Sequence, residues 1–148
     1  MTPLPPAGRL LAVDWGERRI GLALSDETQT LAQPLGTLVR RAGKRFPMPA
    51  FLAHLKQRDV SGVVVGLPLD AGGDEGDSAR AARALAADIA RRTELPVELW
   101  DERFSTARVQ RAVAEMGGGT RGRKEAVDAL AATVLLQHFL DARRGGAT

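Results

Sequence analysis

Residues 10–26 read LLAVDWGERRIGLALSD, two apolar runs on either side of a charged turn. The first run ends in Asp14, and the second begins at Ile20. Apolar runs of this length joined by a short Gly-containing turn predict two paired strands. A carboxylate at the end of a buried strand costs free energy unless another group compensates its charge. The position of Asp14 is therefore the first indication of a functional site.

The rest of the chain alternates strand-like apolar runs with helical patterns. Strands are predicted over residues 10–14, 20–25, 33–39, 60–67 and 97–101, and helices over residues 49–58, 78–92, 105–116 and 125–143. Three short strands in succession predict an antiparallel meander, whereas strand-helix-strand crossovers require parallel pairing. The order predicts an α/β fold: a mixed five-stranded sheet, three antiparallel strands and then parallel strands, with helices on both faces. Either Asp77 or Ser78 is expected to cap the second helix.

The length of 148 residues predicts one domain. We expect residues 9–143 to form it, with a disordered Pro-rich lead at residues 1–8 and a disordered tail at residues 144–148. No run approaches the roughly 20 apolar residues that span a bilayer, and the amino terminus lacks a signal-peptide centre. The chain has no cysteine, which excludes disulfides and thiolate metal sites. These features favour a cytoplasmic protein with no membrane partner.

Acidic side chains stand at the ends of three predicted elements. Asp14 ends the first strand, Asp101 and Glu102 end the fifth, and Asp128 lies in the first turns of the last helix. Each has a simple structural explanation: a turn acid, an ion pair with Arg103, or an acid favoured by the helix dipole. Strand alternation alone cannot choose between Asp101 and Glu102, because adjacent residues point to opposite faces.

Taken together, these acids predict a metal site. The first strand is expected to be central, and ligands gather at the carboxyl ends of strands in α/β sheets. Oxygen ligands without nearby His or Cys suit Mg²⁺ or Mn²⁺. A pair of such ions activates water and stabilises the leaving oxygen of a phosphodiester. We therefore interpret Asp14 as a metal ligand.

Basic residues adjoin the acids in three places: a turn, a strand end and a Gly-rich loop before the last helix. They are Arg18 and Arg19 beside Asp14, Arg103 beside Glu102, and Arg121, Arg123 and Lys124 in the loop. Arginine is suited to phosphate contact, and a loop that leads into a helix amino terminus can bind an anion. The sequence predicts nucleic-acid binding here, while an ordinary solvated loop remains the alternative for residues 117–124.

Five segments resemble one family, in order and at similar spacing: LAVDWGERRIGLALSD, QPLGTL, VVVGLPL, VELWDERFST and KEAVDALAATVLLQHFL. From about Arg9 to Leu140 the chain resembles the YqgF/RuvX proteins, Holliday-junction-resolvase-like members of the RNase H-like superfamily. The resemblance implies a bacterial cytoplasmic nuclease, described for the family as a Holliday junction resolvase or as maturing the 5′ end of pre-16S rRNA. Its catalytic acids would fall on Asp14, Glu102 and Asp128. Bulky Trp15 and acidic Glu17 depart from the usual first turn.

The leading hypothesis is an endonuclease dependent on Mg²⁺ or Mn²⁺ that cuts branched DNA or precursor rRNA. A four-way junction is two-fold symmetric, so paired cuts would require a homodimer. One alternative is a non-catalytic RNA-binding or ribosome-precursor-binding domain, although such a domain would not need all three acids. Another is a sugar-kinase or actin-like ATPase, whose first phosphate loop the DWG…GLALSD stretch also resembles. Those enzymes need two lobes around the nucleotide, and one short domain cannot supply both.

Overall fold

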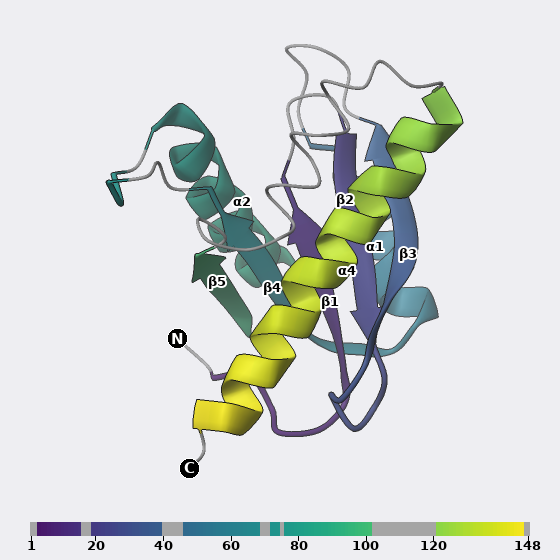
Figure 1. Cartoon of the computed structure of the whole chain (residues 1–148), viewed down its shortest axis with the longest axis vertical. Coiled ribbons are helices and arrows are strands. Elements are labelled where there is room, and N and C mark those ends of the chain that lie inside the picture. Colours follow the sequence, from purple (N-terminus) through teal and green to yellow (C-terminus); the bar gives the residue numbers. More distant parts are fainter. Residues whose placement is uncertain are drawn as a thin grey trace.

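Five strands form one sheet in the order β3-β2-β1-β4-β5 (Figure 1). The structure, a computed structural model, describes residues 3–15, 19–39, 46–68, 72–74, 76–101 and 121–146, without the side chains of residues 121–128 and 145–146. The strands are β1 (Arg9–Asp14), β2 (Arg19–Ser25), β3 (Ala32–Val39), β4 (Val60–Leu67) and β5 (Val97–Asp101). β1 pairs antiparallel with β2, and β2 with β3, whereas β1 pairs parallel with β4, and β4 with β5. The predicted mixed sheet with a central first strand is confirmed.

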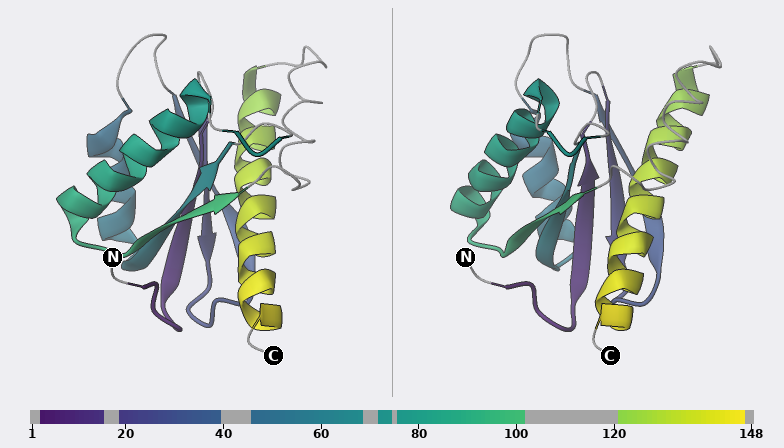
Figure 2. Two further views of the ribbon diagram at one scale, coloured as in Figure 1. Left: turned by 90° about the vertical axis from the view of Figure 1, so that its left-hand side faces the viewer. Right: turned by 60° about the vertical axis from the view of Figure 1, so that its left-hand side comes forward.

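Helices cover both faces of this sheet, as predicted. The helices α1 (Met48–Gln57) and α2 (Asp77–Thr93) lie on one face, and α4 (Arg121–Gly146) crosses the other (Figure 2). No helix within the described residues is both long enough and apolar enough to cross a membrane. The helix predicted over residues 105–116 lies outside the described residues.

Three helix ends differ from the prediction. The N-cap of α2 is Gly76, and no side chain caps this helix, so neither Asp77 nor Ser78 has the predicted role. α4 begins at Arg121, so residues 121–124 are helical although a loop was predicted for them. α4 also continues to Gly146, so residues 144–146 are helical where a disordered tail was predicted.

Side chains of β1 alternate between two apolar cores. Leu11 and Val13 pack in the layer that contains α1 and α2, while Leu10 and Ala12 pack in the layer that contains α4. This follows from the two-residue period of a strand. The face of any strand residue can therefore be assigned from its neighbours in the chain and in the sheet.

The amino-terminal segment is packed where a disordered lead was predicted. Leu4 is 8% exposed and lies in the α4 layer. The Gln29 side-chain amide donates to the carbonyl oxygens of Pro5 at 2.9 Å and Gly8 at 3.1 Å. Gly8 has a φ of 105°, and a Cβ there would lie 2.4 Å from Ser61 Oγ, so this close approach requires glycine. Residues 3–8 are thus part of the domain.

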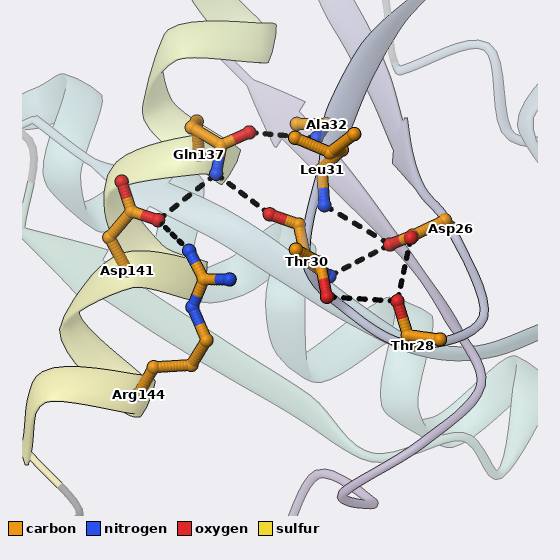
Figure 3. Close-up of polar contacts among 8 residues, drawn as sticks. All are labelled: Asp26, Thr28, Thr30, Leu31, Ala32, Gln137, Asp141 and Arg144. Atoms are coloured by element: carbon orange, nitrogen blue, oxygen red, sulfur yellow. Dashed lines mark hydrogen bonds and ion pairs between the residues drawn. The ribbon is translucent and has the colours of Figure 1, made fainter.

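Asp26 organises the loop between β2 and β3 (Figure 3). Its carboxylate accepts hydrogen bonds from the Thr28 hydroxyl at 2.7 Å, from the Thr30 amide at 2.8 Å and from the Leu31 amide at 3.1 Å. The Thr28 bond, followed by the two amide bonds, lowers the pKa of Asp26. Hydrogen bonds to an ionised carboxylate favour the charged form.

We predict that Asp26→Ala lowers the free energy of unfolding at neutral pH and that the loss shrinks in acid. The folded pKa lies below the ordinary value of 3.8, so the stabilisation is present above pH 3.8 and lost as pH falls through the folded pKa. Urea unfolding of wild type and variant, at pH 7 and at several pH values below 3.8, measures the difference in their free energies of unfolding. A difference independent of pH would show that the carboxylate charge is not what orders the loop.

Candidate active site

Asp14 is the last residue of the central strand and is only 2% exposed. On the β2 side it pairs with Gly21. On the β4 side Val13 pairs with Val65, and the residue that follows Val65 is Gly66. Glycine has no side chain, so neither neighbouring strand places a side chain beside the carboxylate of Asp14.

The carboxylate of Asp14 belongs to the α4 face of the sheet. By strand alternation Asp14 follows Leu10 and Ala12, which pack against α4. Its Oδ1 atom is buried and has no hydrogen-bond donor within the described residues, although the residue does take part in other polar or electrostatic interactions. A buried carboxylate is the type of hard oxygen ligand that suits Mg²⁺ or Mn²⁺.

The register of β5 shows on which face of the sheet Asp101 lies. Asp101 pairs with Leu67, which packs in the α1 and α2 layer. Trp100 packs in the opposite layer, against Phe139 of α4. Asp101 therefore lies on the sheet face opposite to that of Asp14, while Glu102 lies outside the described residues.

Position 128 continues the row of α4 residues that faces the sheet. It precedes Ala132 by four residues, Leu135 by seven and Phe139 by eleven, and all three are buried in the α4 layer. These spacings fall on one helix face. The side chain of Asp128 is outside the described part of the chain. Among the described residues, which include neither the Glu102 nor the Asp128 side chain, no group of three His, Asp or Glu could hold a metal ion.

Of the predicted phosphate-binding residues, Arg19 is placed on the face of Asp14. Ile20 packs in the α1 and α2 layer, so its neighbour Arg19, the first residue of β2, lies on the α4 face. Arg121, Arg123 and Lys124 occupy the first turns of α4, with side chains outside the described part. The remaining two, Arg18 and Arg103, lie outside the described residues.

Both tryptophans pack against the apolar cores. The partly buried Trp100 meets the Phe139 ring of α4 edge to face, with ring centroids 5.3 Å apart. Trp15 is buried and stacks on Phe46 with centroids 6.1 Å apart. The bulky residue in the first turn is thus accommodated by the α1 layer.

Neither histidine is placed as a base beside Asp14. Burial, and then the nearby Arg58, lowers the pKa of His54, and this residue lies on α1, across the sheet from the α4 face. His138 is exposed on α4. His54 is thus a half-buried residue of α1 and His138 a surface residue of α4.

The glycines beside Asp14 were not recognised as site residues from the sequence. Gly21 interrupts the second apolar run, and Gly66 ends the valine run of β4. Each is unremarkable until the register places both next to Asp14. A glycine inside a predicted central strand is the signal that could have indicated a close approach of another group.

The comparisons with known proteins identify the family. A family model described as "RuvX: Holliday junction resolvase" matches residues 8–142. The chain belongs to the RuvX family. The resemblance found in the sequence is thereby confirmed, and the match covers the whole sheet and most of α4.

Relatives in the RuvX family match along nearly their whole length. A protein of Koribacter versatilis is 44% identical over 138 residues, 93% of this chain and 89% of its own. A protein of an Anaeromyxobacter species is 45% identical over 135 residues, 91% of this chain and 98% of its own. Both carry the name "Putative pre-16S rRNA nuclease".

Among solved structures, Thermus thermophilus RuvC in complex with a Holliday junction substrate has the same fold. It superposes with a TM-score of 0.55 and 18% identity over 93% of this chain and 96% of that one. A likeness at this identity concerns the fold alone. This RuvX chain therefore has an RNase H-like fold, as the family resemblance implied.

Proposed function

We propose that this RuvX chain is a metal-dependent endonuclease that hydrolyses phosphodiesters in structured RNA. The observation that carries the proposal is Asp14, a carboxylate 2% exposed at the carboxyl end of the central strand. It lies on the face crossed by the helix that contains Asp128. A buried charge at a strand end is costly, and a bound cation would offset that cost.

In this proposal Asp14, Glu102 and Asp128 hold one or two Mg²⁺ or Mn²⁺ ions. These residues would hold the ion, which would supply the activation of water and the stabilisation of the leaving oxygen of the phosphodiester. Asp14 is held in position by strands on both sides, so its carboxylate needs little rearrangement to act as a ligand. Gly21 and Gly66 leave the space beside it free of their side chains. Arg19, on the same face, would donate hydrogen bonds to a phosphate oxygen.

Glu102 is proposed as the second ligand in preference to Asp101. Asp101 shares the sheet face of Leu67, opposite to that of Asp14. If the alternation of β5 continues by one residue, position 102 returns to the face of Trp100 and Asp14. The alternation of β5 thus favours Glu102, the residue that the family resemblance implied.

The proposed substrate is the precursor of 16S rRNA, in the cytoplasm. Relatives at 44% and 45% identity, matched over nearly their full length, are named for that substrate. A second candidate is the four-way DNA junction, because the family model is described as a Holliday junction resolvase. Junction cleavage would additionally require a homodimer that presents two sites.

A cleavage panel tests the proposed function. Precursor 16S RNA with its 5′ leader, a four-way DNA junction and linear duplex controls are each incubated with Mg²⁺, Mn²⁺ or a chelator. We expect metal-dependent cleavage of the precursor RNA and none in chelator. Salt-sensitive binding without cleavage of any substrate would reject the proposal in favour of a non-catalytic RNA-binding domain. Saturable binding in a nucleotide titration would favour the ATPase alternative instead.

A further inference from the structure

A side-chain amide of α4 forms two hydrogen bonds with the backbone at the start of β3. The Oε1 atom of Gln137 accepts from the amide of Ala32 at 2.9 Å, and its Nε2 atom donates to the carbonyl of Thr30 at 2.9 Å (Figure 3). The same Nε2 atom donates to Asp141 Oδ1 at 3.1 Å. Asp141 also forms an ion pair with Arg144, one turn further along α4.

A second hydrogen bond joins the carboxyl-terminal half of α4 to the loop between β2 and β3. Arg143 donates from Nη1 to the Oε1 atom of Gln29 at 2.7 Å, and its guanidinium lies 5.6 Å from the centre of the Phe139 ring. Gln29 is buried and in turn holds the carbonyls of Pro5 and Gly8. The carboxyl-terminal half of α4 is therefore bonded to a loop that is itself bonded to the amino-terminal segment.

The loop between β2 and β3 is held in place by its own hydrogen bonds. The carboxylate of Asp26 bonds the amides of Thr30 and Leu31, on either side of the Thr30 carbonyl that Gln137 contacts. Because the loop is held by its own hydrogen bonds, a bond from α4 to it defines where the helix stands along the sheet.

Near position 128 the apolar contacts of α4 specify its position less sharply. Ala131 and Ala132 are buried against the sheet there, and small side chains offer few ridges that resist sliding, whereas the larger Leu135, Leu136 and Phe139 pack further along the helix. Hydrophobic burial is also non-directional, whereas a hydrogen bond weakens steeply when its length or angle changes. A side-chain amide that both donates and accepts is satisfied at only one axial position and one rotation of the helix.

We propose that Gln137 is a positioning residue that sets the register of α4 on the sheet and, through it, the place of residue 128 relative to Asp14. Residue 128 lies nine residues before Gln137, which is about 14 Å along a helix. A rigid helix transmits a shift at one end to the other. The consequence for metal binding rests on the proposed function, whereas the consequence for helix register does not.

Spin-label distances test the register directly. The chain has no cysteine, so labels attach only at engineered sites. Leu130→Cys labels α4 two residues beyond position 128, where the side chain is 46% exposed, and Lys56→Cys labels the exposed face of α1. The pair is introduced into the wild type, into Gln137→Met, which removes both bonds to the backbone together with the bond to Asp141, and into Gln137→Asn, which keeps an amide that is too short to form both backbone bonds. Gln57→Met is the matched control, because Gln57 is an exposed helical glutamine that bonds only its neighbour Arg58 among the described contacts.

We expect one narrow distance distribution in the wild type and in Gln57→Met, and a shifted or broadened one in both Gln137 variants. Calorimetric Mn²⁺ titration should show binding weakened on the order of tenfold in the Gln137 variants alone, as for other residues that orient metal ligands. Unchanged distances in both Gln137 variants would overturn the proposal. If the wild type itself binds no Mn²⁺, the proposed metal site fails, and the distances still decide the role of Gln137.

Discussion

Asp14→Asn is expected to abolish metal-dependent cleavage while the protein remains folded. The change replaces one buried carboxylate oxygen with an amide nitrogen of nearly the same size, so the packing around β1 is retained. Loss of a ligand removes several kcal/mol of transition-state stabilisation, which corresponds to a rate about a thousandfold lower. Single-turnover cleavage of precursor RNA at saturating Mg²⁺ measures the effect. Equal cutting by wild type and variant would reject the proposed site.

Thermal unfolding of the same two proteins separates catalysis from folding. Without divalent ions the variant should unfold at the same temperature as the wild type or higher, since an amide costs less to bury than a carboxylate. Mn²⁺ should raise the unfolding temperature of the wild type only, because a ligand stabilises the state that binds it. A variant much less stable than the metal-free wild type would indicate that Asp14 has a structural role.

The second large effect is a difference in cleavage rate between substitutions at two neighbouring acidic residues, Glu102 and Asp101. Glu102→Gln is expected to lower the single-turnover rate on the order of a hundredfold or more, and Asp101→Asn by less than about threefold. Asp101 lies on the sheet face of Leu67, away from Asp14, and the two substitutions change the same kind of group by the same amount. Asp101→Asn is therefore the matched control for Glu102→Gln.

The opposite order of effects would contradict the face assignment. A large loss in Asp101→Asn with little effect in Glu102→Gln would mean that Asp101 reaches the metal. Both variants should bind precursor RNA with similar affinity in chelator, because neither neutral side chain removes a phosphate contact. A filter-binding measurement at several salt concentrations checks this.

The strands of the sheet could be predicted because each is specified by residues that are close together in the sequence. Short apolar runs bounded by turns placed all five strands to within one residue at each end. The hairpin around Asp14 and the crossovers to β4 and β5 then predicted a mixed sheet with the first strand at its centre. Asp14 could be identified as a candidate because a charge at the end of such a run is itself an anomaly.

What could not be predicted depends on contacts distant in sequence. Leu4 is buried because Gln29 and the carboxyl-terminal half of α4 close over the amino-terminal segment, and no local pattern in the Pro-rich lead indicates this. The face of Asp101 could be assigned only from its partner Leu67 and from the Trp100 contact with α4. The start of α4 was missed because Gly122 favours a loop by about 1 kcal/mol, a preference that the rest of a long helix overrides.

Anomalous diffraction from a crystal grown with Mn²⁺ tests the central claim most directly. The account predicts a peak about 2.1 Å from a carboxylate oxygen of Asp14, on the α4 face of the sheet. The same experiment on Asp14→Asn should show a weaker peak or none. If crystals grown at an Mn²⁺ concentration that supports cleavage show no anomalous peak within coordination distance of Asp14, the account is contradicted.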